Sequence, residues 1–463
     1  MILSQLLDQI RAFPGVRVMT DNDIRDDYSH DTWPVSTVQR KLDRHLYRPD
    51  AVVYLTSAEK VPDILALANR AGVPITARGL GSSVTGQPLP QHGGIVLDIS
   101  GVQSEPRLDE TNLTVSVSAG MRGGDLEEWL NQRGYTSGNH PQSLTRSTVG
   151  GWLATRESGQ CSSRYGSIED LIVRYTVILA DGTTIPLAAN PRAAVGPDLR
   201  HLFLGTEGTL GVVTDVTFKV FPVPEHTICE AFRMPSVSAG LGVMRAIARS
   251  GIRPSLVRFY DFAEARHAMQ SEEFDGCALF LAHEGIRTVA EAEHRISTQF
   301  ALDAGGLSLG DEPVRNWLAR RYDFSTVEQL IAEPGGYAET IEVAHLWSGI
   351  ETLHKELTSA LRPLADEVLG HFSHVYMQGS SLYVILLGRA PDDLTAAERL
   401  DEIWRIAMEV TARVGGELSH HHGAGLARLP FIVKTMGPAH DILRRIKNII
   451  DPKGILNPGK LGL

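Results

Sequence analysis

The sequence predicts an α+β fold built from two large domains. The chain has 463 residues, which at about 150 residues per domain corresponds to roughly three domains or two large ones. Hydrophobic residues make up 43% and charged residues 21%, an ordinary globular composition. Short apolar or alternating segments typical of strands recur between helix-like segments that end in glycine. The run Pro222-Val223-Pro224 closes one such β-rich stretch, and we place the main domain boundary there.

Composition also excludes several classes of protein. The net charge of −11 argues against a nucleic-acid groove, because phosphate binding needs clustered positive charge. No apolar run reaches the length of about 18 residues that a membrane helix needs. The segment from Met1 to Asp8 is typical of an amphipathic helix and not of a signal peptide. The three cysteines, Cys161, Cys229 and Cys277, form no CxxC pair and suit a reducing cytoplasm.

The elements before the boundary follow from local patterns. Residues 1–45 are expected to be helical and then irregular. A helix over 57–71 begins at the N-cap Ser57 and ends at Gly72. A second helix is predicted over 124–134, where Gly134 marks its end. Strands are predicted at 51–55, 73–77, 94–99, 113–119 and 171–179, and a longer β-rich run at 210–221.

Beyond the boundary, longer helices alternate with strands. Helices are predicted over 236–250 and 396–414, and strands over 254–259 and 383–387. Helices are expected to dominate residues 311–362.

A glycine-rich loop directly after a predicted strand is the most informative motif. Three glycines and three hydroxyl side chains within ten residues give a loop whose unshielded N–H groups can surround a phosphate. The Rossmann pattern fails at Val84 and the Walker pattern at Gln87. A strand–loop–strand phosphate cradle is therefore favoured over an ordinary flexible loop. Its candidate residues are Arg78, Gly79, Leu80, Gly81, Ser82, Ser83, Gly86 and Gln87.

Two further stretches combine small and polar residues in the same half of the chain. A structureless segment of this length is usually functional or disordered, and small residues allow a backbone to approach a flat ligand closely. The first stretch offers Pro141, Ser143, Ser147, Thr148, Gly150, Gly151, Thr155, Ser158, Gly159 and Tyr165. The second offers Glu207, Gly208, Gly211 and Val212.

These three stretches, in this order, resemble the FAD-binding domain of the vanillyl-alcohol-oxidase type, also called the PCMH type. The resemblance implies that the first loop holds the pyrophosphate of FAD and that the later stretches line the isoalloxazine. The tail with Asn457 and Lys460 resembles the FAD-contacting C-terminal segment of that group. It further implies an FAD domain over 1–224, a cap domain of antiparallel sheet and helices over 225–415, and a completing segment over 416–463. Relatives with a flavin linked through the loop carry a histidine where this chain has Ser82, so FAD is expected to be non-covalent.

Within that group the chain most closely resembles the alkyldihydroxyacetonephosphate synthase and FAD-linked oxidase subfamily. The segments from Ser147 to Gly159, from Ser373 to Tyr383 and from Ser419 to Gly423 carry this resemblance. It implies that Tyr383 acts in acid–base chemistry beside the flavin and that His420, His421 and His422 line the same cavity. Related 2-hydroxyacid dehydrogenases hold a metal in these segments, but their ligand set is missing here, and no metal is expected.

Each of these residues has an alternative interpretation. The three histidines could be surface residues or metal ligands, although on a strand His421 would point away from His420 and His422. Tyr383 could be a core tyrosine. Arg258 lies in an apolar strand and must be paired if buried, so it forms either a structural ion pair or, as the resemblance implies, an anion anchor.

One position departs from the synthase pattern. Where that subfamily has a second, phosphate-gripping arginine, this chain has Glu328, with Arg320 and Arg321 out of register. A carboxylate near a phosphate is repulsive. We therefore expect an FAD-dependent oxidoreductase that oxidises an alcohol or 2-hydroxy acid by hydride transfer to flavin N5. The alternatives are a redox-neutral synthase-like transferase and a flavin-binding sensor without turnover. The expected partner is a small molecule, and a homodimer remains open.

Overall fold

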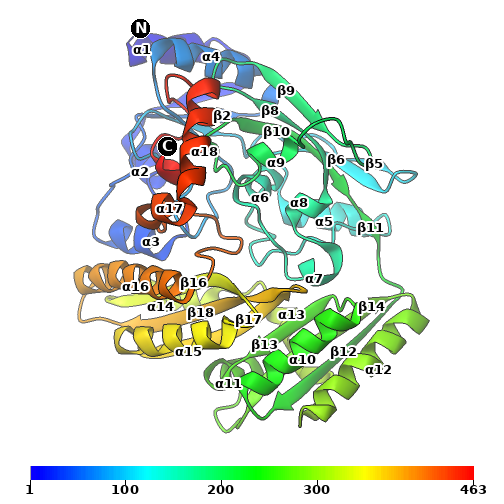
Figure 1. Ribbon diagram of the computed structural model, residues 1–463. Helices are drawn as coiled ribbons and strands as arrows, with labels where there is room; N and C mark the ends of the chain where they lie inside the picture. Colours follow the sequence, from blue (N-terminus) through cyan, green and yellow to red (C-terminus); the bar gives the residue numbers. More distant parts are fainter. Residues whose placement is uncertain (1) are drawn as a thin grey trace.

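Two sheets of moderate size form the N-terminal part of the protein, and a larger third sheet follows (Figure 1). The structure is a computed structural model that describes residues 2–463. In the first sheet the strand order is β1-β2-β4-β3. β1 is antiparallel to β2, whereas β2, β4 and β3 run parallel. The strands are β1 (Val16–Met19), β2 (Ala51–Leu55), β3 (Ile75–Arg78) and β4 (Ile95–Asp98).

The second sheet is antiparallel and has the order β5-β6-β10-β8-β9. Its strands are β5 (Arg107–Asp109), β6 (Thr114–Ser118), β8 (Ile172–Ile178), β9 (Thr184–Ala188) and β10 (Val212–Lys219). A short pair, β7 (Tyr135–Thr136) and β11 (Phe221–Pro222), lies beside it. The helices of this part are α1 (Leu3–Arg11), α2 (Asn22–Asp27), α3 (Pro34–Lys41), α4 (Val61–Ala71), α5 (Gly123–Asn131), α6 (Val149–Thr155), α7 (Ser162–Tyr165), α8 (Ile168–Leu171) and α9 (Arg200–Phe203).

The third sheet has seven antiparallel strands in the order β15-β12-β14-β13-β17-β18-β16. Its strands are β12 (His226–Met234), β13 (Leu256–Tyr260), β14 (Cys277–Gly285), β15 (Leu307–Gly310), β16 (Gly336–Leu346), β17 (Glu367–Val375) and β18 (Gly379–Arg389). The accompanying helices are α10 (Val237–Ser250), α11 (Phe262–Met269), α12 (Arg287–Asp303), α13 (Glu312–Arg320), α14 (Ser325–Ala332), α15 (Ile350–Leu361) and α16 (Asp393–Val414).

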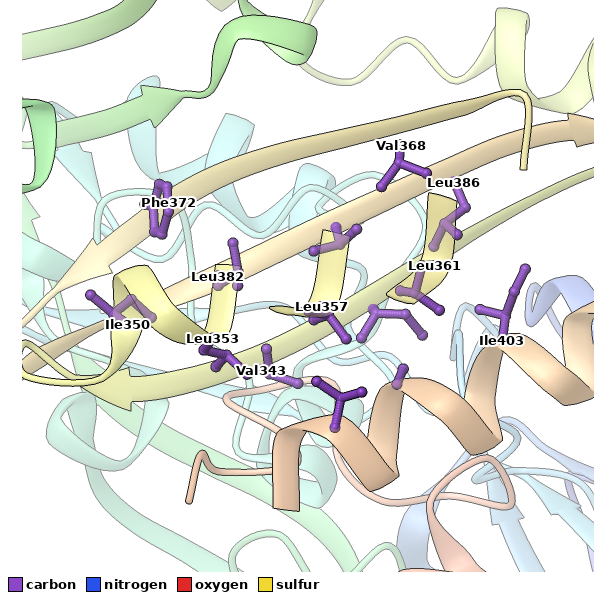
Figure 2. Close-up of a cluster of buried hydrophobic side chains, with 14 of the residues drawn as sticks. Val343, Ile350, Leu353, Leu357, Leu361, Val368, Phe372, Leu382, Leu386 and Ile403 are labelled. Carbon is purple, nitrogen blue, oxygen red and sulfur yellow. The ribbon is translucent and has the colours of Figure 1, made fainter. Parts of the chain in front are cut away.

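One face of this sheet carries the main apolar core. Figure 2 shows Leu353 and Leu357 of α15 meeting Val343 of β16 and Leu382 of β18, with Ile403 of α16 nearby. Alternate residues of a strand point to opposite faces. Burying Leu382 in this core therefore places its neighbour Tyr383 on the opposite face.

The C-terminal segment returns to the first sheet through α17 (Leu429–Met436) and α18 (Pro438–Ile450), drawn in red in Figure 1. The N–H of Ile75 in β3 donates to the carbonyl of Ile455 at 2.7 Å, and Leu456 forms a parallel bridge with Ile75. The last residues of the sequence thus extend the sheet that carries the glycine-rich loop. Within residues 2–463, no helix is both long and apolar enough to span a bilayer.

Two expectations about secondary structure were wrong, and one strand was not predicted. Helices α13, α14 and α15 dominate residues 311–362 as expected, but the strand β16 lies between α14 and α15, where β-branched Thr340, Ile341 and Val343 pair along β18 over eleven residues. The segment after Thr148 is ordered as α6, since the Thr148 side chain caps it by accepting from the Gly151 N–H. Residues 12–45 contain β1, α2 and α3 and are not irregular.

Candidate active site

The glycine-rich loop leaves β3 at Arg78 and enters β4 without an intervening helix, as predicted. The Arg78 guanidinium donates to the carbonyls of Tyr28 and His30 at 3.2 and 2.8 Å, which fixes the base of the loop. Gly79 packs against the Thr148 side chain so closely that a Cβ there would collide with it. The first loop is therefore held directly against the start of α6.

Backbone donors of this loop have no protein partner. Among the described residues 2–463, the N–H groups of Leu80 to Val84 donate no hydrogen bond to another protein group. Five successive N–H groups left open in a tight loop form a concave donor array that fits a phosphate or pyrophosphate. The side chain of Gln87, at the end of the loop, is by contrast bound to the protein, because its Nε2 donates to the His422 carbonyl at 2.6 Å.

The predicted stretches converge at Gly423, next to the three histidines. A Cβ at this residue, whose φ is +76°, would lie 2.6 Å from Gln87 Nε2 and 2.8 Å from Glu207 Oε1. It would also lie 3.6 Å from the Thr155 Cβ. Loops from three distant parts of the sequence therefore meet on one side of the histidine segment.

Three predicted cofactor residues act as ties between these loops. The buried Glu207 carboxylate accepts from the N–H groups of Ala424 and Gly425 at 2.6 and 3.1 Å. Asn457 Nδ2 donates to the carbonyls of Gln87 and Glu207 at 3.2 and 2.7 Å. Lys460 Nζ donates to the Leu89 carbonyl at 2.5 Å, and burial lowers its pKa to about 8. Their polar atoms hold the protein together around the cofactor loops.

The other predicted residues of the second and third stretches divide between packing and loop structure. The Ser147 hydroxyl accepts from the Trp152 indole N–H at 2.9 Å, and the Thr155 hydroxyl donates to the Gly151 carbonyl at 3.1 Å. The Tyr165 hydroxyl donates to Glu284 in β14, so this side chain contacts the third sheet. Among the described residues, the side chains of Pro141, Ser143 and Val212 form no hydrogen bond, and Val212 packs in an apolar core. The remaining predicted residues there are the glycines Gly150, Gly159, Gly208 and Gly211, of which Gly159 donates its N–H to Asn139 Oδ1 at 3.1 Å.

A row of four polar side chains crosses the third sheet on the face opposite the core. Tyr260 of β13 pairs with His371 of β17, His371 pairs with Tyr383 of β18, and Tyr383 pairs with Glu342 of β16. The His371 and Tyr383 rings are stacked, with centroids 4.6 Å apart and an angle of 13°. All four residues are at least nine-tenths buried. The registers of four strands thus bring together residues that are far apart in sequence.

Tyr383 meets the histidine segment directly. Its hydroxyl lies 2.6 Å from His421 Nε2, and His421 Nδ1 lies 2.8 Å from His420 Nδ1. His420 Nε2 lies 2.7 Å from the Tyr376 hydroxyl, which completes a chain of four side chains. Burial, together with the nearby Glu342 carboxylate, raises the pKa of Tyr383 well above its ordinary value. Tyr383 is therefore a neutral phenol at physiological pH.

The three histidines do not lie on a strand, in contrast to the geometry expected from sequence. Their backbone bends around the Glu342 carboxylate, which accepts from the N–H groups of His420 and His421 at 2.6 Å and of His422 at 3.4 Å. Arg428 donates to the same carboxylate at 3.1 Å, and both side chains are fully buried. Burial alone would raise the pKa of Glu342, but His421, His422 and Arg428 outweigh it and hold the pKa well below its usual range.

His374, His420 and His421 form a set that could hold a metal ion, with one ring nitrogen of each lying within 4.8 Å of the others. Each ring already has a protein partner. His374 Nδ1 lies 2.8 Å from the Ser162 hydroxyl, and burial lowers the pKa of His420 to about 3. The expectation that no metal binds here stays a prediction.

Arg258 lies in β13, as predicted, and borders the same row. Its Nε donates to the Tyr260 hydroxyl at 2.9 Å, and its Nη2 lies 2.7 Å from His371 Nε2. The guanidinium also lies 5.1 Å from the ring centre of Trp317. Glu328, by contrast, is half-exposed on α14 and pairs with Arg146 of the loop before α6.

Sequence reasoning missed Glu342, His371 and Glu264, which organise this site. Glu342 lies in β16, a strand that was not predicted within residues 311–362, so its position beside Tyr383 was hidden. A possible signal was the presence of two glutamates, Glu339 and Glu342, among β-branched and aromatic residues, since a buried carboxylate needs partners. His371 and Glu264 carry no local signal, because only the pairing of β13 with β17 brings them together.

Two family models match the chain. Residues 49–188 match the model described as an FAD binding domain, and residues 223–461 match the model described as the C-terminal domain of FAD linked oxidases. The second match alone covers more than half of the chain.

Curated relatives agree with these matches. The FAD-linked oxidoreductase YgcU of Escherichia coli (strain K12) is 31% identical, and the alignment covers 98% of each chain. Alkyldihydroxyacetonephosphate synthase of Dictyostelium discoideum is 28% identical over 89% of this chain and 73% of its own. A mitochondrial D-lactate dehydrogenase (cytochrome) of Arabidopsis thaliana is 28% identical over 99% of this chain and 80% of its own.

Solved structures show the same fold. A structure of alkyldihydroxyacetonephosphate synthase matches with a TM-score of 0.82 at 24% identity, covering 99% of this chain and 85% of the other. A structure of p-cresol methylhydroxylase matches with a TM-score of 0.84 at 15% identity, covering 99% and 96%. The predicted two-part PCMH-type α+β fold is confirmed.

The residues present fit FAD. The open N–H groups of Leu80 to Val84 supply the donors that a pyrophosphate requires, and they lie within the residues that the FAD model matches. Together with the matched models and the 31% identical relative, this site identifies the chain as a member of the FAD-linked oxidases, an FAD-dependent oxidoreductase.

Proposed function

We propose that the protein oxidises an alcohol or, preferably, a 2-hydroxy acid beside Tyr383. The observation that carries this proposal is the short contact between the Tyr383 hydroxyl and His421 Nε2. FAD, when bound, supplies the hydride acceptor; the protein supplies orientation and proton transfer.

The proton of the substrate hydroxyl would pass to the Tyr383 oxygen while Tyr383 passes its own proton to His421 Nε2. The imidazolium formed on His421 is stabilised by Glu342, whose Oε1 lies 3.3 Å from His421 Nδ1. This pathway needs no phenolate at rest, in keeping with the raised pKa of Tyr383.

Arg258 would hold the carboxylate of a 2-hydroxy acid. One guanidinium balances the charge of a single carboxylate and donates to it. A phosphate dianion would need further cations, yet Arg320 donates to the Ala268 carbonyl and the Glu328 carboxylate is paired with Arg146. These contacts favour an oxidase or dehydrogenase activity over a redox-neutral synthase activity, although synthases are among the relatives.

The test is an anaerobic screen of flavin reduction by 2-hydroxy acids, alcohols and hydroxylated aromatic compounds. A stoichiometric loss of oxidised-flavin absorbance is the expected result. Acyl-dihydroxyacetone phosphate and a long-chain alcohol form the second arm. Ether product without net flavin reduction would replace this proposal with the synthase activity.

A further inference from the structure

Behind Arg258, two buried residues form a hydrogen-bonded pair that the proposed proton pathway does not use. His371 Nδ1 lies 2.8 Å from the carboxylate of Glu264, and His371 Nε2 lies 2.7 Å from Nη2 of Arg258. His371 is 2% exposed and Glu264 is 6% exposed. Groups enclosed so completely are held in one arrangement.

The hydrogen-bond roles in this chain follow from donor chemistry. A guanidinium is always protonated and only donates. His371 Nε2 must therefore accept from Arg258, and the ring proton must sit on Nδ1, where it donates to Glu264. This assignment holds whether or not Glu264 is ionised, because a protonated carboxyl still offers its carbonyl oxygen. It matters because burial raises the pKa of Glu264 to about 8.

The pair leaves part of Arg258 free. Its Nε donates to Tyr260 and its Nη2 to His371. Among the described residues, Nη1 has no hydrogen-bond partner in the protein, and it is not one of the fully buried atoms that lack a partner, so it is open to a ligand. The His371 ring also stacks on Tyr383. The same ring therefore contacts both Arg258 and the phenol proposed to transfer the proton.

We propose that Glu264 and His371 are positioning residues that fix the Arg258 guanidinium with its Nη1 side open to a substrate carboxylate. This inference rests on the proposed function, since it assumes a substrate that is oxidised beside Tyr383. Neither residue is proposed to touch the substrate.

Oxalate serves as the probe, because it offers carboxylates but no transferable hydride. Its Kd is measured on the holoenzyme from the perturbation of the flavin spectrum. Glu264→Leu is expected to raise this Kd about 10- to 160-fold, the range for losing a hydrogen bond to a charged group. Glu264→Gln keeps an acceptor for His371 Nδ1 and is expected to retain most of the affinity. His267→Gln, on the exposed side of the same helix, is the matched control.

A double-mutant cycle separates positioning from general damage. Adding Glu264→Leu to Arg258→Ala is expected to cause no further loss of oxalate affinity, since the pair acts through Arg258. Additive losses, or no binding of oxalate to the wild type, would overturn the inference. If the wild type binds oxalate but no compound in the substrate screen reduces its flavin, the proposed function is refuted and the inference about Arg258 is not.

A second readout needs neither substrate nor activity. With ¹⁵N-labelled histidine, His371 is expected to show the neutral tautomer protonated at Nδ1, assigned by its loss in His371→Gln. The double variant Glu264→Leu with Arg258→Ala, which removes both hydrogen-bond partners of the ring, is expected to shift this signal toward the other tautomer or a mixture. A wild-type signal for the tautomer protonated at Nε2 would contradict the assignment.

Discussion

Tyr383 holds a proton in a place where burial and a neighbouring carboxylate both oppose its loss. Its partner His421 has the Glu342 carboxylate 3.3 Å from its Nδ1. In the mechanism we propose, the phenol would therefore relay a proton between the substrate hydroxyl and the imidazole and would not itself be the final base.

Tyr383→Phe removes this relay and little else, because the ring still fills its space. We expect flavin reduction by the best substrate to slow by about 10²- to 10⁴-fold, the usual contribution of general acid–base groups, with FAD content unchanged. Stopped-flow reduction under anaerobic conditions measures the rate. A loss below about threefold would remove Tyr383 from the mechanism.

Glu339, on the opposite side of β16, gives a second prediction at this scale. Burial raises its pKa from 4.5 to about 8, while its oxygens accept from Trp404 Nε1 and the Thr340 N–H. The folded state keeps a proton that the unfolded state releases, so stability falls as pH rises from about 4.5 to about 8.

In Glu339→Gln, the fall in the free energy of unfolding between pH 5 and pH 8 is expected to be smaller than in the wild type by more than about 1 kcal/mol. Urea denaturation at the two pH values measures it, and Glu351→Gln on the exposed side of α15 is the control. An unchanged slope would show that Glu339 is already ionised in the folded protein.

At the scale of elements, β16 and the histidine segment depend on each other. Arg428 is fully buried and donates to the Leu418, Gly423 and Glu342 carbonyls at 2.6, 2.8 and 2.8 Å, besides its ion pair with Glu342. Removing one member of such a pair leaves an uncompensated buried charge.

Arg428→Met is therefore expected to lower the free energy of unfolding by about 3–5 kcal/mol. Adding Glu342→Gln should restore part of this loss, since the stranded charge is then gone. Denaturant unfolding of the two variants and the wild type checks both expectations. A single-variant loss under about 1 kcal/mol would mean that solvent reaches Glu342.

Elements with a strong local signal were predictable from sequence, and those set by sheet pairing were not. The strand–loop–strand motif at Arg78 and the strand around Arg258 were found because glycines, hydroxyls and apolar runs are local features. The strand β16 was not predicted, because its two glutamates interrupt the alternation of apolar and polar residues, although both have buried partners. The row from Tyr260 to Glu342 depends on three inter-strand registers, which no local pattern reveals.

At the scale of the whole molecule, the cofactor site is assembled from segments hundreds of residues apart. The family models and the fold establish FAD as the cofactor, and the open N–H groups of Leu80 to Val84 offer it hydrogen bonds but no nucleophile. Ser82, in the loop position where linked relatives carry a histidine, cannot form a histidyl bond.

We therefore expect FAD to be held without a covalent link. Heat or acid denaturation followed by centrifugation should release all the yellow colour into the supernatant, where it can be identified as FAD by chromatography. Colour remaining in the protein pellet would contradict this expectation and would indicate a linkage at another residue.

The tie made by Asn457 has a consequence for how the protein matures. Its amide joins the carbonyls of Gln87 and Glu207, and the adjoining Leu456 lies beside β3. A ribosome makes Gln87 and Glu207 long before it makes Asn457, so the nascent chain carries both loops without the residue that fastens them together. The site that these contacts complete is consequently assembled only when translation has passed Asn457.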